Sequence, residues 1–138
     1  MSAFEQAQLR ILFSEDDPDS LELTRLMLES SGFEVVCSDN PHDVLARARG
    51  ERFDAYLLDN WMPVLSGIEL CRRLREIDPS TPIIFFSGAT FPTDKAEAFA
   101  SGAQDYLTKP ATREYLAGAI TLAIRNSKAV RSPGRTIP

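Results

Sequence analysis

The sequence of 138 residues is poor in several features, and each shortage excludes a class of protein. Cysteine occurs only at Cys37 and Cys71, without the spacing of a metal-binding motif, which indicates two free thiols rather than a disulfide scaffold or a zinc site. No apolar run approaches the roughly 20 residues that a membrane span requires. Residues 1–8 have neither the basic nor the apolar region of a signal peptide. We therefore expect a cytoplasmic protein without membrane contact.

Positive charge is also scarce. The chain has 15 Lys and Arg residues against 20 Asp and Glu residues, which gives a formal net charge of −5. An acidic balance favours solubility and argues against a nucleic-acid partner. The length suits one domain. We expect an N-terminal extension over 1–8, one domain over 9–127, and a flexible tail over 128–138 that shows no periodicity.

The sequence does contain several short, continuously apolar segments. Residues 55–58 (Ala-Tyr-Leu-Leu) run directly into Asp59, and a turn that contains Pro63 follows. A strand that is apolar at successive positions has both faces buried, as in a parallel sheet covered by helices. In chain order, the segments that predict strands are 10–14, 33–37, 53–58, 83–86 and 106–108.

Amphipathic segments with helix-capping signals separate these strands. Pro18 follows two acidic residues that can cap a helix, and Gly32 can end that helix in a left-handed conformation. Five strand–helix alternations with short connections predict a three-layer α/β sandwich. Its core would be a doubly wound five-stranded parallel sheet of order 2-1-3-4-5, the flavodoxin-like topology. The later helices are expected over 42–49, 67–77, 93–101 and 112–127.

Polar side chains follow four of the strands and therefore gather at the carboxyl edge of the sheet. Glu15 and Asp16 follow the first strand and Asp59 follows the third. Ser87 follows the fourth strand and Lys109 follows the fifth. Acids this close together raise one another's pKa values unless cations compensate them. Lys109 supplies one positive charge, and Mg²⁺, a hard ion that takes oxygen ligands, suits the remainder.

This combination of residues fits phosphoryl transfer to an aspartate. Asp59 is the expected nucleophile and phosphoacceptor. Lys109 would balance the negative charge that arrives, and the Ser87 hydroxyl would donate a hydrogen bond to the phosphoryl group. Catalysis would then rest on positioning and charge neutralisation.

Five motifs in order carry a resemblance to a known family. They are Ile11-Leu12 with Glu15-Asp16-Asp17-Pro18, Leu58-Asp59 with Met62-Pro63 and Gly67, Ser87, Gly102-Ala103, and Asp105-Tyr106-Leu107-Thr108-Lys109-Pro110. Over nearly all of residues 9–127, the sequence resembles the CheY-like receiver domain of two-component response regulators. The resemblance implies that a sensor histidine kinase or a histidine phosphotransfer protein donates a phosphoryl group to Asp59.

The resemblance also implies a metal site. Glu15, Asp16, Asp59 and the backbone carbonyl of Trp61 would surround a bound Mg²⁺ or Mn²⁺ ion. Glu15 stands where most receivers have aspartate, and its longer side chain is expected to reach the metal directly or through water. Trp61 is bulky for a position beside the phosphoryl group, and we hypothesise that it screens the aspartyl phosphate from water.

Signal output is implied by the same resemblance. Ser87 and Tyr106 would form the switch pair that responds to phosphorylation, although Tyr106 can also be read as ordinary packing on an edge strand. The Lys109–Pro110 peptide bond would be cis. The face made by the fourth helix, fifth strand and fifth helix would engage a partner of unknown identity or pass the phosphoryl group on. We expect a monomer or a weak phosphorylation-dependent dimer.

Three alternatives stay open at this point. A Mg²⁺-dependent phosphatase with an aspartyl nucleophile usually has a second acid two residues after the nucleophile, where this chain has Trp61. A flavodoxin-like cofactor carrier needs phosphate-binding donors after the first strand, where Glu15, Asp16 and Asp17 would repel a phosphate. A receiver that has lost phosphorylation would act as a protein-binding module, and only Glu15 favours this reading. We expect no turnover of external substrates.

Overall fold

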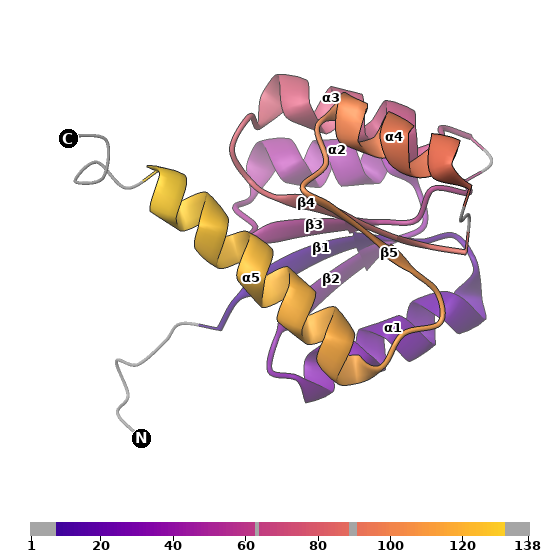
Figure 1. The fold of residues 1–138 in the computed structure, drawn as a ribbon, viewed down its shortest axis with the longest axis vertical. Helices are drawn as coiled ribbons and strands as arrows, with labels where there is room; N and C mark the ends of the chain where they lie inside the picture. The colour runs from indigo at the N-terminus through magenta and orange to yellow at the C-terminus, as the bar shows by residue number, and fades with distance from the viewer. Residues whose placement is uncertain (1–7, 63, 89–90, 132–138) are drawn as a thin grey trace.

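The computed structural model describes residues 8–62, 64–88 and 91–131, which form one sheet and five helices (Figure 1). The strands are β1 (Arg10–Ser14), β2 (Glu34–Ser38), β3 (Ala55–Leu58), β4 (Ile83–Ser87) and β5 (Asp105–Thr108). The helices are α1 (Pro18–Ser30), α2 (Pro41–Gly50), α3 (Gly67–Ile77), α4 (Pro92–Ser101) and α5 (Arg113–Arg131). No helix in this part of the chain is long and apolar enough to cross a membrane.

All five strands run parallel, in the order β2-β1-β3-β4-β5. α1 and α5 cover one face of the sheet, and α2, α3 and α4 cover the other (Figure 1). The predicted three-layer sandwich and its strand order are therefore confirmed. The chain leaves β1 through α1 on one face and leaves β3 through α3 on the other. The carboxyl ends of β1 and β3 consequently form the switch point at which such folds place their chemistry.

Alternate residues of the central strands enter two different hydrophobic cores. In β1, Ile11 and Phe13 pack on the side of α1 and α5, whereas Leu12 packs on the side of α2, α3 and α4. In β3, Leu57 packs on the first side and Leu58 on the second. All five residues are fully buried. This two-sided burial is the physical reason that the strands appear in the sequence as continuous apolar runs.

Helix ends follow the capping signals in the sequence. The Asp17 carboxylate accepts a hydrogen bond from the Ser20 N–H at 2.8 Å and caps α1. The Ser66 hydroxyl accepts a hydrogen bond from the Glu69 N–H at 3.2 Å and caps α3, which has the predicted bounds. Gly32, just after α1, adopts the expected left-handed conformation with φ of 98°.

Several element boundaries differ from those expected. α5 continues to Arg131 instead of ending at Ser127, because no helix breaker stands between these residues. Residues 128–131 thus belong to the helix, and the rest of the expected tail lies outside the described residues, as do residues 1–7 of the expected extension. β2 begins one residue later than predicted, because the Phe33 N–H donates to the Leu28 carbonyl of α1 at 3.2 Å.

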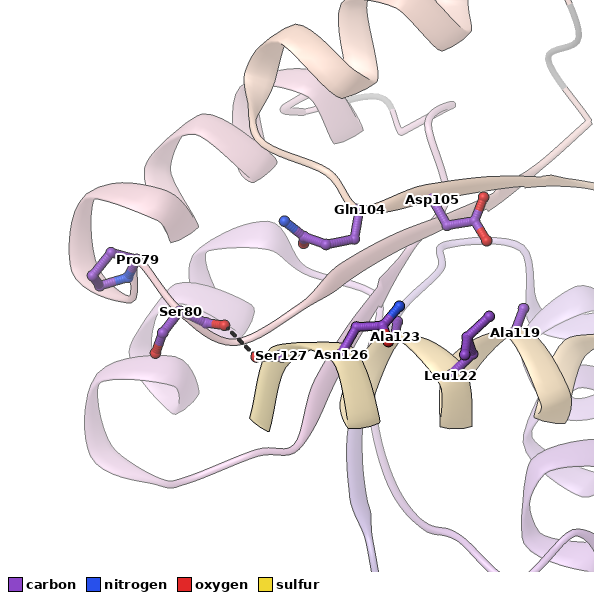
Figure 2. Close-up of a pocket in the computed structure, with 9 residues that line it drawn as sticks. All are labelled: Pro79, Ser80, Gln104, Asp105, Ala119, Leu122, Ala123, Asn126 and Ser127. Atoms are coloured by element: carbon purple, nitrogen blue, oxygen red, sulfur yellow. Dashed lines mark hydrogen bonds between the residues drawn. The ribbon is translucent and has the colours of Figure 1, made fainter. Parts of the chain in front are cut away.

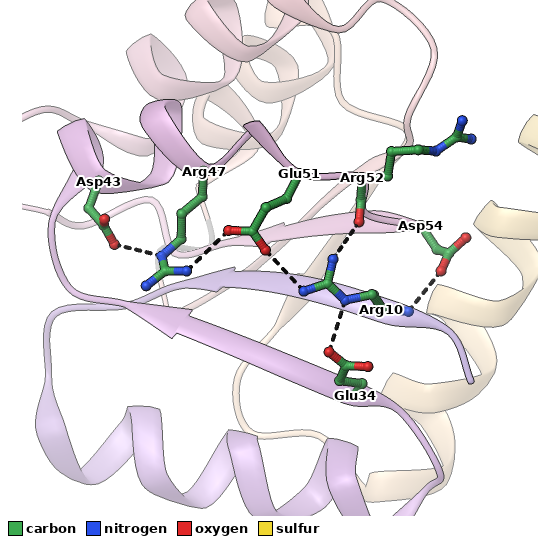
Figure 3. Close-up of polar contacts among 7 residues, drawn as sticks. All are labelled: Arg10, Glu34, Asp43, Arg47, Glu51, Arg52 and Asp54. Atoms are coloured by element: carbon green, nitrogen blue, oxygen red, sulfur yellow. Dashed lines mark hydrogen bonds and ion pairs between the residues drawn. The ribbon is translucent and has the colours of Figure 1, made fainter. Parts of the chain in front are cut away.

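Charges at the amino edge of the sheet neutralise one another (Figure 3). Arg10, the first residue of β1, donates hydrogen bonds to Glu34 Oε2 at 2.9 Å and to Glu51 Oε1 at 3.0 Å. Its guanidinium carbon also lies 4.7 Å from the centre of the Phe53 ring. Arg47 continues this chain of contacts by donating to the other Glu51 carboxylate oxygen at 3.2 Å. The amino edge is therefore a paired structural network.

Candidate functional site

Two buried acids mark the carboxyl edge of the sheet. Glu15 follows β1, and its N–H donates to the Ser38 carbonyl of β2 at 3.1 Å. Asp59 follows β3, and its N–H donates to the Ser14 carbonyl of β1 at 3.1 Å. The hydrogen bonds of the sheet therefore fix both backbones. Glu15 is only 1% exposed and Asp59 only 6% exposed, so both carboxylates are held away from bulk water.

Asp16 completes a cluster of three carboxylates. One carboxylate oxygen from each of Glu15, Asp16 and Asp59 lies within 4.8 Å of the other two. Burial raises the pKa of Glu15, a hydrogen bond from Lys109 opposes this effect, and the charge of Asp59 adds to the increase. Converging carboxylate oxygens are the ligands that hard divalent ions prefer. The residues present therefore fit the predicted Mg²⁺ or Mn²⁺ ion.

Lys109 brings a positive charge to this cluster from the end of β5. Its backbone N–H donates to the last carbonyl of β4 at 2.9 Å, and its peptide bond to Pro110 is cis, as the resemblance implied. The ammonium group donates to Glu15 Oε1 at 2.5 Å and to Ser20 Oγ at 2.9 Å. Among the described residues, the ion pair of Lys109 is with Glu15 and not with Asp59. Glu15 therefore belongs both to the acidic cluster and to the lysine.

Ser87 and Tyr106 lie close together on the neighbouring strands β4 and β5. Ser87 is fully buried, and Tyr106 is 7% exposed, so its ring is directed inward. That ring stacks on Phe85, with ring centres 5.5 Å apart and planes 7° from parallel. Burial raises the pKa of the Tyr106 hydroxyl, and hydrogen bonding with the side chains of Ser87 and Asn60 opposes the increase. The role of this pair as a switch stays a prediction.

Trp61 lies at the rim of the site. The residue is 69% exposed, and it lines a cavity of about 370 Å³ at the carboxyl edge. An exposed indole at the rim can restrict access to the cavity without sealing it. The screening hypothesis and the role of the Trp61 carbonyl as a ligand stay predictions. The residues that line the cavity are Glu15, Asp16, Asp17, Ser20, Asp59, Trp61, Ser87, Gly88 and Lys109.

The sequence did not predict the roles of three residues that support the site. Ser20 reaches the lysine from the first turn of α1. Met62 Sδ accepts a hydrogen bond from the Ser14 hydroxyl at 3.2 Å, which ties the loop after Asp59 to β1. Gly67 allows a close approach, because a Cβ atom there would lie 2.5 Å from the Asp59 carbonyl oxygen. The only feature of the sequence that pointed to Ser20 was the position of its hydroxyl, in the first turn of the helix that follows Glu15 and Asp16.

A second depression lies beside α5 at the start of β5 and has a volume of about 540 Å³ (Figure 2). Leu122 and Ala123 form part of its apolar wall. The Ser127 hydroxyl donates to the Ser80 carbonyl at 2.8 Å across one end of it. Its lining residues include one acid, Asp105, and no basic residue. Unlike the cavity at the carboxyl edge, this depression therefore brings no opposite charges together.

Known proteins share this sequence pattern. The family model of the response regulator receiver domain matches residues 11–121 of the sequence. The cell cycle transcriptional regulator CtrA of Caulobacter vibrioides is 36% identical over 120 residues, which cover 87% of this chain and 52% of that protein. The chain thus spans about half the length of the curated relatives that it matches.

Solved structures agree with this match. A CheY-like response regulator receiver domain protein from Methanospirillum hungatei JF-1 superposes with a TM-score of 0.84 at 26% identity, over 90% of this chain and 99% of that chain. The receiver domain of the sensor histidine kinase PA1611 from Pseudomonas aeruginosa PAO1 superposes with a TM-score of 0.80 at 30% identity, over 86% and 99%. In that structure a magnesium ion is coordinated in the active site cleft. The present chain belongs to the response regulator receiver domain family of two-component signalling systems.

Proposed function

We propose that Asp59 accepts a phosphoryl group from the phosphohistidine of a sensor histidine kinase or a histidine phosphotransfer protein. One Asp59 carboxylate oxygen forms a bond to phosphorus, and the bond from phosphorus to the donor nitrogen breaks. That nitrogen keeps the electron pair, and the imidazole, protonated on its other nitrogen, leaves as a neutral ring. The observation that supports this proposal is the convergence of three carboxylates and Lys109 in one cavity.

The acids have two tasks in this proposal. Glu15, Asp16 and Asp59 hold Mg²⁺ or Mn²⁺, with the backbone carbonyl of Trp61 as a further oxygen ligand. The ion supplies neutralisation of the charged phosphoryl oxygens. Asp59 is also the nucleophile, and its attachment to the β1 ladder keeps it in place as the donor approaches. Lys109 neutralises part of the charge that the phosphoryl group brings.

The proposed output is a shift of the face formed by α4, β5 and α5. Within α4 only Ala98 and Ser101 are buried, so little packing opposes movement of this helix. After phosphorylation of Asp59, the Ser87 hydroxyl donates a hydrogen bond to the phosphoryl group, and Tyr106, whose side chain hydrogen-bonds with that of Ser87, follows it. This is a population shift that a local charge drives. The altered face engages a partner protein or passes the phosphoryl group on.

We also propose that the domain turns over no external substrate. A phosphatase with an aspartyl nucleophile usually needs a second acid two residues further on to protonate the leaving group. Trp61 occupies that position and carries no proton-transfer group. Asp59 would therefore be phosphorylated and dephosphorylated within a signalling cycle.

The proposal is tested by incubating the protein with acetyl phosphate and Mg²⁺ and measuring its intact mass. We expect one added phosphoryl group, which alkali removes as it does other acyl phosphates, and no addition when EDTA is present. Asp59→Asn is the matched variant because it keeps the size of the side chain, and it should fold but add no phosphoryl group. Undiminished addition to Asp59→Asn would reject Asp59 as the acceptor.

A further inference from the structure

Ser20 contacts the functional lysine, although neither the motifs nor the proposed reaction gives it a role. Among the described residues, the Lys109 ammonium group has two hydrogen-bond acceptors, Glu15 Oε1 at 2.5 Å and Ser20 Oγ at 2.9 Å. Ser20 lies in the first turn of α1 and lines the same cavity as Asp59. The serine is thus an uncharged partner of the lysine inside the site.

The three N–H groups of the Lys109 ammonium group have different partners. A lysine ammonium has three N–H donors and no acceptor. Glu15 and Ser20 take two of them, and the Phe86 ring centre lies 5.5 Å from the nitrogen. Within the part of the chain that the structure describes, one donor is left for a group that binds in the cavity. The lysine is consequently held at two points before a phosphoryl group arrives.

We propose that Ser20 is a positioning residue for Lys109, an inference that rests on the proposed phosphoryl transfer. Glu15 has competing partners, because its carboxylate belongs both to the acidic cluster and to the lysine. Ser20 carries an uncharged hydroxyl, and a divalent cation held by the three carboxylates prefers their charged oxygens to it. Ser20 therefore keeps the ammonium group in the cavity that Asp59 also lines when Glu15 turns to a cation, and Lys109 meets the phosphoryl group in an ordered position.

If Ser20 served only to stabilise α1, replacing it would lower the unfolding temperature, but its contacts predict otherwise. Its backbone N–H donates to the Asp17 cap at 2.8 Å, and alanine would keep this bond. Alanine also has a higher helix propensity than serine. Ser20→Ala should therefore unfold at the wild-type temperature or above it. A loss of phosphorylation in this variant would then come from the lost contact with Lys109.

The first measurement is the rate of phosphorylation by acetyl phosphate at saturating Mg²⁺. We expect Ser20→Ala to lower the second-order rate constant about tenfold, the size expected for losing one hydrogen bond to a charged group. Ser20→Thr keeps a hydroxyl and should stay close to the wild-type rate. Thr121→Ala is the control, because it removes a helical hydroxyl that does not line the cavity, and its rate should be unchanged.

A second measurement reads the contact itself, without metal or phosphoryl donor. In ¹⁵N NMR spectra of the lysine side chains, the Lys109 ammonium signal should be visible, because hydrogen bonding slows its exchange with water. Ser20→Ala should weaken this signal, and Ser20→Thr should keep it. In a Lys109→Met background, Ser20→Ala should have no further effect on the phosphorylation rate, since the two residues act as one unit.

The outcomes separate this inference from the function on which it rests. No phosphoryl uptake by the wild-type protein would overturn the proposed function. Uptake by the wild-type protein at an unchanged rate in Ser20→Ala would overturn the role of Ser20 and leave Asp59 as the acceptor. An equal loss of rate from Ser20→Ala in the Lys109→Met background would also overturn it, because the serine would then act independently of the lysine.

Discussion

Replacing Gly67 with alanine should damage both the stability of the domain and the position of its phosphoacceptor. A Cβ atom at this position would lie 2.5 Å from the Asp59 carbonyl oxygen, 2.8 Å from Asn60 Cα and 2.9 Å from Phe85 Cε2. Non-bonded carbon atoms settle at about 3.5–4.0 Å, so the surroundings must move by about 1 Å. Two of the three atoms belong to the backbone and cannot rotate away.

The cost follows from this geometry. Overpacking a well-packed site destabilises by about 1–3 kcal/mol, and the upper value applies here because the backbone must shift. For a domain of this length, about 3 kcal/mol lowers Tm by about 10 °C. The shift also moves Asp59, and a misplacement of about 1 Å can cost as much as about 100-fold in rate. We therefore expect slower phosphorylation together with lower stability.

Thermal unfolding followed by circular dichroism and the rate of acetyl phosphate labelling measure the two effects. Gly118→Ala is the matched control, since nothing lies within 4 Å of a Cβ atom there. Because Gly118 is an exposed residue inside α5, alanine should stabilise the protein by about 1 kcal/mol. If Gly67→Ala unfolds at the wild-type temperature and is labelled at the wild-type rate, the reasoning from close approach is wrong.

The other predictions concern one structural arginine, one titrating acid and the rim of the site. Arg75→Met should lower the free energy of unfolding, measured in urea, by about 2–3 kcal/mol. Arg75 donates to the Thr81 carbonyl at 2.6 Å and to three other acceptors, and the variant loses these hydrogen bonds. An unchanged urea midpoint of unfolding would contradict this prediction. Burial raises the pKa of Asp78, but hydrogen bonds from groups that include Thr81 and Tyr56 outweigh it and leave the pKa below its ordinary value of 3.8. The stability that Asp78 contributes is therefore present above pH 3.8 and is lost as the pH falls through the lower folded value. In the Asp78→Asn variant, the free energy of unfolding should fall less steeply as the pH drops below 3.8. The same slope as in the wild-type protein would refute the assignment of this pH dependence to Asp78. Trp61 fluorescence should resemble that of an exposed indole and change when Mg²⁺ is added, and a spectrum insensitive to Mg²⁺ would argue against its place at the metal site.

The fold could be predicted where local signals are strong. α3 has its expected bounds, because Ser66 caps its start and a regular apolar period continues to Ile77. The start of β2 was less predictable, since it depends on a contact with another element. The hydrogen bond from the Phe33 N–H to the Leu28 carbonyl is this contact, and no local sequence pattern encodes it. The continuation of α5 to Arg131 is compatible with the sequence, which has no helix breaker between Ser127 and Arg131.

The site could be predicted in part, for a similar reason. Strand ends place Glu15, Asp16 and Asp59 at one edge, so their convergence follows from topology alone. The partner of Lys109 does not follow from topology. The additional methylene of Glu15 and the helical direction of Ser20 decide which acceptors reach the ammonium group, and these are properties of side-chain geometry. The departure of Glu15 from aspartate was visible in the sequence, but its pairing with the lysine was not.

The identity of the phosphorylated residue tests the central claim most directly. Borohydride reduces an aspartyl phosphate to homoserine, and mass spectrometry of peptides then locates the modified position. After treatment with a phosphohistidine donor protein or acetyl phosphate in the presence of Mg²⁺, we expect homoserine at position 59 and an unmodified position 59 when Mg²⁺ is omitted. An intact Asp59 in protein that carries the phosphoryl group elsewhere, on Asp16 or on His42, would contradict the assignment.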